Sequence, residues 1–245
     1  MNPKSLLLIA LCVLPLMTGI SSGFAAPSFV EPPSFAGTSK RAVFISPMEN
    51  AEPTWGSESY KSLLEGAGYQ VDILLDGNAS ISFFETGLAK YDLIVLRTDS
   101  FVSKGLTYYC AGDKADASAR GTFAGETVLK EVMVGECVGF STLFLRNRYP
   151  AGSLSGLVIA VGSNTAELST VFLQAGAAAL IGFYDEHCTQ WGNLDSYSLK
   201  LLYYLSQGYS VEGANIQLYI YLYTGHGTTA DWILPYWAGD GSYKI

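Results

Sequence analysis

Three short apolar runs follow one another between residues 41 and 98, and the segments between them are only long enough for one helix each. RAVFISPM (41–48), YQVDILLD (69–76) and YDLIVLRT (91–98) have the continuous hydrophobicity of strands buried on both faces. GSESYKSLLEGA (56–67) and residues 80–89 are typical of helices. Because a helix between two such strands makes a right-handed crossover between parallel neighbours, the pattern predicts a parallel sheet.

The same alternation returns in the second half of the chain. Residues 155–162 predict a fourth strand, 167–176 a helix and 177–183 a fifth strand, and the apolar residues of 195–207 fall on one face of a helix. The predicted fold is an α/β three-layer sandwich, with a mainly parallel sheet and helices on both of its faces. We expect it to form a single domain over residues 41–245.

The middle and the end of the chain are less regular. Residues 99–130 are polar and rich in Gly, Ala and Ser, and residues 131–147 predict the two strands of a hairpin. Residues 214–223 alternate as a strand would, but Ser210 and Glu212 have the features of a helix start, so we expect a helix. The aromatic, Gly-rich residues that follow predict a final strand and a loop.

The N-terminal segment is typical of an exported protein. Residues 5–20 are almost entirely apolar, and small residues follow them, which predicts a secretory signal peptide over residues 1–25. The alternative is an uncleaved membrane anchor. Residues 26–40 are rich in Pro and Ser and predict a linker. The protein is therefore expected to be secreted or extracytoplasmic, with membrane contact only through an uncleaved anchor.

Charge and cysteine content exclude several classes of partner. The formal net charge is −8 and no basic residues cluster, so neither nucleic acid nor anionic lipid is an expected partner. Of the three cysteines after residue 25, Cys110 and Cys137 are the expected disulfide pair, and Cys188 remains. No CxxC motif and no cluster of His residues is present, so we expect no metal site and no cofactor.

Polar side chains follow three of the predicted strands. In a parallel sheet, ligands bind beyond the carboxyl ends of the strands, so these side chains are the candidate site. The candidates are Asp99 and Ser100 after the third strand, Gly162, Ser163 and Asn164 after the fourth, and Asp185, Glu186, His187 and Cys188 after the fifth.

The order of these elements resembles that of the caspase-fold cysteine peptidases, in particular the exported clostripain- and gingipain-like members. YDLIVLRTDSF, LVIAVGSNT, GAAALIGFYD and LKLLYYLSQGYSVEGA carry the resemblance, which spans roughly residues 41–215. In that family the third strand ends in a His and the fourth in a Gly-Cys pair, and the His activates the Cys for attack on a peptide carbonyl.

Two departures from the family pattern follow when the motifs are compared residue by residue. The position of the His corresponds to Asp99 and that of the Cys to Ser163. A carboxylate at a strand end is a poor base for an alcohol, so the resemblance implies a peptidase homologue without its catalytic dyad. Such a protein is expected to act as a binding or scaffold protein, with an extended peptide or a protein as its partner.

Other interpretations of the same residues remain open. His187 oriented by Asp99 gives Ser163 a base, which makes the protein an active hydrolase, although VGSNT lacks the G-x-S-x-G elbow of the α/β-hydrolases. Cys188 beside His187 gives a thiol enzyme. Asp185 and Glu186 either bind a cation or a basic side chain, or form a solvated acidic loop. A surface domain whose cleft has no function is the third class.

Overall fold

A computed structural model describes residues 40–50, 56–184, 191–225 and 235–245. The chain divides into two units, Met1–Gly37 and Thr38–Ile245, and all described residues belong to the second. The predicted signal peptide and almost all of the predicted linker lie outside the described residues.

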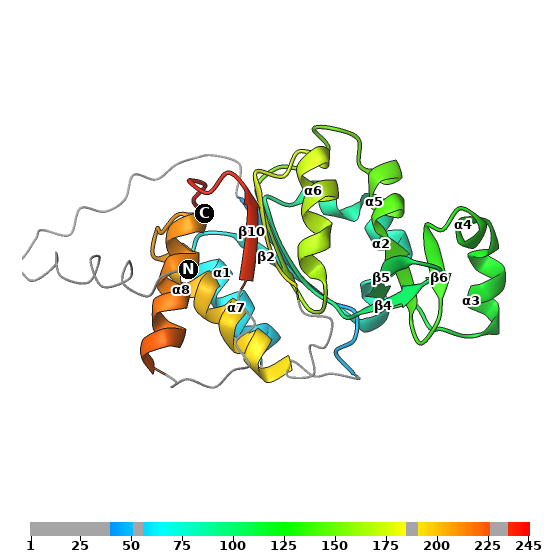
Figure 1. Ribbon diagram of the computed structural model, residues 1–245, viewed down its shortest axis with the longest axis horizontal. Helices are drawn as coiled ribbons and strands as arrows, with labels where there is room; N and C mark the ends of the chain where they lie inside the picture. Colours follow the sequence, from blue (N-terminus) through cyan, green and yellow to red (C-terminus); the bar gives the residue numbers. More distant parts are fainter. Residues whose placement is uncertain (1–39, 51–55, 185–190, 226–234) are drawn as a thin grey trace, which may run out of the picture. The chain divides into compact units, whose positions relative to one another are not determined.

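The second unit is built on a six-stranded sheet that is parallel except for one edge strand (Figure 1). In spatial order its strands are β2 (Gln70–Leu75), β1 (Arg41–Ser46), β3 (Leu93–Arg97), β8 (Leu157–Val161), β9 (Ala179–Phe183) and the antiparallel β10 (Pro235–Gly239). The prediction of a mainly parallel sheet is therefore confirmed, with each predicted strand two or three residues shorter than expected.

Helices cover both faces of this sheet, as expected (Figure 1). One face carries α1 (Ser57–Gly66), α7 (Trp191–Ser206) and α8 (Val211–Gly225), and the other carries α2 (Ile81–Thr86), α5 (Thr142–Arg148) and α6 (Ser169–Ala175). Alternate residues of each strand enter two separate apolar cores: Ala42 and Phe44 of β1 pack toward α1 and α7, while Val43 and Ile45 pack toward α2. Two further segments are 3-10 turns, Gly87–Lys90 after α2 and Thr165–Leu168 before α6.

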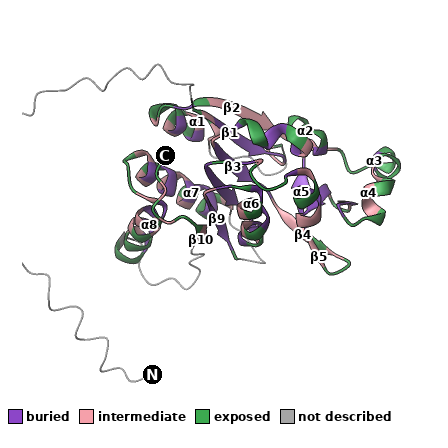
Figure 2. Cartoon of the chain, turned by 90° about the horizontal axis from the view of Figure 1, so that it is seen from above, coloured by how far each residue is buried: buried purple, intermediate pink, exposed green. Residues whose placement is uncertain are grey.

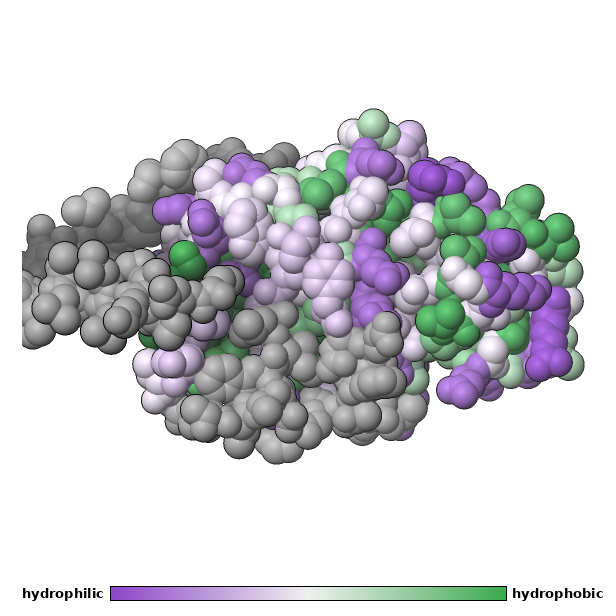
Figure 3. All heavy atoms as spheres, viewed as in Figure 1, coloured by the Kyte–Doolittle hydropathy of each residue, from purple (hydrophilic) through white to green (hydrophobic). Residues whose placement is uncertain are grey.

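A second, antiparallel sheet occupies the middle of the chain, where the sequence predicted a single hairpin. Its order is β4 (Ser100–Ser103), β5 (Leu106–Ala111), β7 (Val138–Ser141) and β6 (Val132–Val134), with α3 (Ala117–Thr122) and α4 (Ala124–Val128) between β5 and β6. The hairpin predicted over residues 131–147 is confirmed as β6 and β7. Its second strand ends at Ser141, and the residues after it form α5. The surface over this sheet, α3 and α4 mixes hydrophilic and hydrophobic residues (Figure 3).

Two other expectations concern single elements. The helix predicted over residues 214–223 is confirmed as α8, and the Ser210 hydroxyl accepts a hydrogen bond from the N–H of Gly213 at 3.2 Å, as a capping residue does. The helix predicted over residues 195–207 is confirmed as α7, whose described part begins four residues earlier, at Trp191.

Candidate functional site

The carboxyl ends of β3 and β8 lie side by side in the centre of the large sheet. Their ladder ends with Arg97 opposite Val161, and the N–H of Thr98 donates to the carbonyl of Val161 at 2.9 Å. Asp99 and Ser163 each lie two residues beyond the last paired residue of their strand. The two positions that the resemblance singled out therefore follow neighbouring strand ends.

Gly162 permits the close approach of these two strand ends. Its φ is +141°, and a Cβ atom at this position would lie 1.7 Å from the carbonyl oxygen of Thr98. Only glycine combines this backbone conformation with so short a contact. The turn after β8 therefore depends on Gly162, and the direction in which Ser163 leaves the strand depends on it too.

Asp99 and Ser100 lead from the large sheet into the small one. The carbonyl of Asp99 accepts from the N–H of Cys110 at 2.9 Å, and Ser100 pairs with Tyr109 in the ladder of β4 and β5. The Oδ1 atom of Asp99 accepts from the N–H of Ser100 at 2.8 Å. The carboxylate of Asp99 is thus held by the adjacent peptide of its own chain.

Ser163 and Asn164 form a buried turn between β8 and α6. Ser163 is 5% exposed, and no hydrogen bond joins its hydroxyl to any residue in the described part of the chain. Asn164 has a left-handed conformation with φ +55°, and its carbonyl accepts from the hydroxyl of Tyr109 at 3.0 Å. Thr165 fastens the turn further, because its hydroxyl donates to the carbonyl of Ala160 at 2.8 Å.

Burial raises the pKa of Tyr109, which keeps its hydroxyl protonated as the donor to Asn164. Tyr109 is fully buried and lies in β5, so this hydrogen bond ties the small sheet to the end of β8. The second sheet therefore braces the candidate site from one side.

The remaining candidates fall outside the described residues. These are Asp185, Glu186, His187 and Cys188. The strand before them, β9, pairs with β8 in parallel and ends at Phe183. Their chain position therefore follows the strand end next to that of Ser163, and the alternative in which His187 contacts Ser163 lies outside the described residues.

A buried ion pair, which the sequence analysis missed, lies at the same edge of the sheet. Nε of Arg97 donates to Oδ1 of Asp195 at 2.9 Å, and Nη2 donates to Oδ2 at 3.2 Å. The guanidinium also stacks over the Trp191 ring, 4.3 Å from its centroid. Arg97 is the last residue of β3 and Asp195 belongs to α7, so the pair joins the central strand to the helix that covers it.

Polar side chains from two more elements surround this pair. The Ser46 hydroxyl at the end of β1 donates to the Glu49 carboxylate at 2.9 Å and accepts from Nη1 of Arg97 at 3.5 Å. The Tyr60 hydroxyl of α1 contacts Asp195 and forms a short hydrogen bond with Ser198. Burial raises the pKa of the Asp195 carboxyl, and the hydrogen bonds from Arg97 oppose that rise.

This buried cluster lies at the topological switch point of the sheet. The chain runs from β1 outward to β2 on one side and from β3 outward to β8 on the other, so the crevice of a doubly wound sheet lies beyond β1 and β3. Here Arg97 and Ser46 extend from those two strand ends toward α7. One signal in the sequence pointed to the cluster: LIVLR places an Arg at the end of a fully buried strand, and a buried charge requires a partner.

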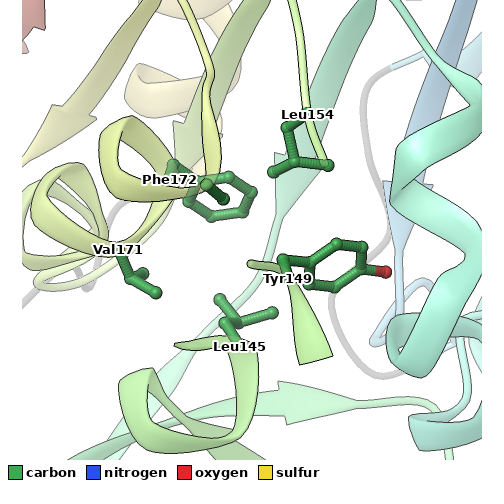
Figure 4. A pocket seen from close by; sticks show the side chains of 6 residues that line it. Leu145, Tyr149, Leu154, Val171 and Phe172 are labelled. Carbon is green, nitrogen blue, oxygen red and sulfur yellow. The ribbon is translucent and has the colours of Figure 1, made fainter. Parts of the chain in front are cut away.

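Three further observations concern the rest of the described chain. Between α5 and α6 lies an apolar gap that has no room for a water molecule, lined by Leu145, Tyr149, Leu154, Val171, Phe172 and Ala175 (Figure 4). No group of three or more His, Cys, Asp or Glu side chains in the described residues is placed to hold a metal ion. None of the helices that are described is long and apolar enough to cross a bilayer.

Comparisons with known proteins find matches among solved structures. No family model matches the sequence, and no curated protein matches it. Among solved structures, the crystal structure of the Drosophila initiator caspase Dronc is similar, with a TM-score of 0.47 and 9% identity over 95% of this chain and 96% of that one. A likeness this low assigns no family and no activity to the chain.

Proposed function

We propose that this protein is an exported, non-catalytic homologue of the caspase-fold peptidases, which binds an extended peptide or a protein without cleaving it. The observation that carries the proposal is the position of Asp99 and Ser163 just beyond the adjacent ends of β3 and β8. These are the positions at which the resembling family has its His and its Cys.

The chemistry of these two side chains supports the absence of catalysis. An alcohol becomes a nucleophile only when a base within hydrogen-bond reach, about 2.6–3.2 Å, accepts its proton. In the described part of the chain no hydrogen bond joins the Asp99 carboxylate to the Ser163 hydroxyl, and Oδ1 of Asp99 accepts from the N–H of Ser100.

Export is supported by two independent features. Residues 5–20 are apolar and are followed by small residues, and the cysteines Cys110 and Cys137 form a disulfide between β5 and the residue before β7. Disulfides form and persist in oxidising compartments.

N-terminal sequencing of the secreted protein tests the predicted cleavage. The sequence is expected to begin close to Ala26, whereas an intact Met1 on a membrane-bound product would identify an anchor.

The proposal is tested by rebuilding the family's pair of side chains. The purified wild type is expected to generate no new N-termini in an unfolded protein substrate. The double variant Asp99→His, Ser163→Cys is expected to react faster with iodoacetamide than the matched single variant Ser163→Cys. The physical reason is that an imidazole opposite the thiol stabilises the thiolate.

Two results would contradict the proposal. Cleavage of the substrate by the wild type, abolished by Ser163→Ala, would make the protein an active hydrolase. Equal thiol reactivity of the double and single variants would mean that the two positions do not form a family-like pair.

A further inference from the structure

Helix α8 is apolar on both of its sides. Its inner side packs against the core with four fully or almost fully buried residues, Val211, Ala214, Leu218 and Leu222. Its outer side carries four large apolar residues that are 45–64% exposed, Ile216, Tyr219, Ile220 and Tyr223. Figure 2 shows α8 at the rim of the unit, with exposed residues along it. A helix that is apolar all round is normally buried all round.

The four outer residues form one continuous stripe, which we call the α8 face. Their spacing of three, one and three residues places them on one side of the helix over two turns. The rings of Tyr219 and Tyr223 stack with centroids 6.1 Å apart. This contact within the helix holds the two Tyr rings in place relative to one another.

The composition of this helix is that of an interface centre. No charged residue occurs from Gly213 to Gly225, although the chain has 36 Asp, Glu, Lys and Arg residues in all, 22 acidic and 14 basic. Buried centres of protein interfaces are depleted in charge and enriched in Tyr. The one charged residue of α8, Glu212, is exposed and lies on the same side one turn before Ile216, at the N-terminal end of the stripe.

The nearest cation is already engaged at the margin of the stripe. Nζ of Lys200 lies 5.0, 5.2 and 4.8 Å from the ring centroids of Tyr203, Tyr204 and Tyr221. It joins α7 to α8 and leaves the α8 face neutral. A face without basic residues has no attraction for anionic lipid or for an acidic partner.

The size of the α8 face fits the centre of a dimer interface. A half-exposed Tyr presents on the order of 100 Å², so the four side chains together present roughly 400 Å². A standard interface buries about 800 Å² of surface on each partner. The α8 face would supply about half of that area, all of it from apolar or aromatic side chains.

We propose that the α8 face is the contact between two copies of this chain, which pack α8 against α8 about a two-fold axis. Two antiparallel copies of this stripe complement one another, because the Ile side chains of one copy pack between the Tyr rings of the other. Each copy has a net charge of −8, and the two copies repel one another least where both surfaces are neutral. The inference does not depend on the proposed function, because it rests on another part of the fold.

Sedimentation velocity of the full chain over a wide concentration range tests this proposal. The wild type is expected to shift from one to two times the mass of a single chain as the concentration rises. Ile220→Glu is expected to abolish this shift, because it places two like charges next to the two-fold axis. Val128→Glu adds the same charge at a residue of α4 that is 81% exposed, and it is expected to leave the shift unchanged.

A photo-reactive phenylalanine analogue in place of Tyr219 gives a second readout that does not depend on how well a variant folds. Cross-linked peptides are expected to join α8 of one copy to α8 of the other. A wild type that stays monomeric, a dimer that Ile220→Glu leaves intact, or cross-links from α8 to another element would each overturn the proposal. Binding of the monomer to uncharged vesicles, lost in Ile220→Glu, would assign the face to lipid and would overturn it as well.

Discussion

Arg97 and Asp195 are the two residues on which the edge of the large sheet depends most. Both are almost completely buried, and their two hydrogen bonds connect β3 with α7. A buried pair of this kind is of little net benefit over apolar residues, but removing one partner leaves a charge without compensation. Because the pair lies at the switch point, it helps to shape the edge of the sheet at which a ligand would bind.

Removal of the Asp195 carboxylate is expected to destabilise the fold strongly. Asp195→Ala should lower the free energy of unfolding by about 3–5 kcal/mol, because Arg97 then keeps its charge in a buried site. Urea unfolding followed by circular dichroism measures the loss. The control is Glu65→Ala, which removes a pair with Lys61 at 4.0 Å on the surface and should cost less than about 1 kcal/mol. Equal losses in the two variants would mean that the Arg97 charge is not buried.

Gly162 is the second residue with a clear energetic role. Gly162→Ala is expected to lower the free energy of unfolding by about 2–4 kcal/mol, because the new methyl group meets the carbonyl of Thr98 at a left-handed φ. Gly66→Ala is the matched control, since Gly66 lies in α1 with no atom within 4 Å of its added Cβ. That change is expected to be neutral or to stabilise by up to about 1 kcal/mol. Similar melting curves for both variants would show that the turn after β8 relaxes freely.

At the scale of elements, the strands of the large sheet follow from the sequence, whereas most of the small sheet does not. Buried parallel strands are continuous apolar runs, which LIVLR and LVIAV are. The hairpin of β4 and β5 turns at Lys104 and Gly105, both with positive φ, and Lys-Gly is not the Asn-Gly or Asp-Gly signal of such a turn. The strand β4 also lacks a buried apolar face, since none of its four residues is fully buried.

The disulfide is expected to hold the small sheet together. Cys110 and Cys137 are 27 residues apart in the chain, and closing a loop of this length stabilises a fold by about 3 kcal/mol. The double variant Cys110→Ala, Cys137→Ala should lose about that amount in urea unfolding. Peptide mapping without reduction should find the Cys110 peptide linked to the Cys137 peptide. A link from either one to Cys188 would refute this pairing.

At the scale of the whole unit, the alternation of strands and helices was enough to predict the layers, but not what lies between them. The two cores follow from period-two burial along each strand. The sequence indicates that Arg97 needs a buried partner, but it does not identify that partner, because Ser46, Tyr60, Arg97 and Asp195 come from four separate elements and meet only through the crossovers. The position of Asp99 and Ser163 beyond neighbouring strand ends was predictable, since neighbouring parallel strands end at the same edge.

The buried tyrosines make the stability of the unit sensitive to alkali. Burial, with help from the Asp72 carboxylate, raises the pKa of Tyr91 to about 12, and burial raises that of Tyr149 to about 12. The folded state then holds protons that the unfolded state, with a tyrosine pKa of about 10, has already lost. The free energy of unfolding is therefore expected to be constant below about pH 10 and to fall as the pH rises toward about 12.

Urea unfolding at a series of alkaline pH values measures this fall. Tyr91→Phe removes one of the titrating groups, so its free energy of unfolding should decline less steeply with pH than that of the wild type. A wild type whose stability does not change across this range would contradict the burial of these hydroxyls.

The central claim is that Ser163 stands in the place of a nucleophile without acting as one. Mass spectrometry of the purified protein after treatment with a serine-directed fluorophosphonate tests it most directly. We expect no adduct on Ser163, because no base among the described residues forms a hydrogen bond with its hydroxyl. An adduct on Ser163 of the wild type that disappears in His187→Ala would contradict the account and would identify a working hydrolase.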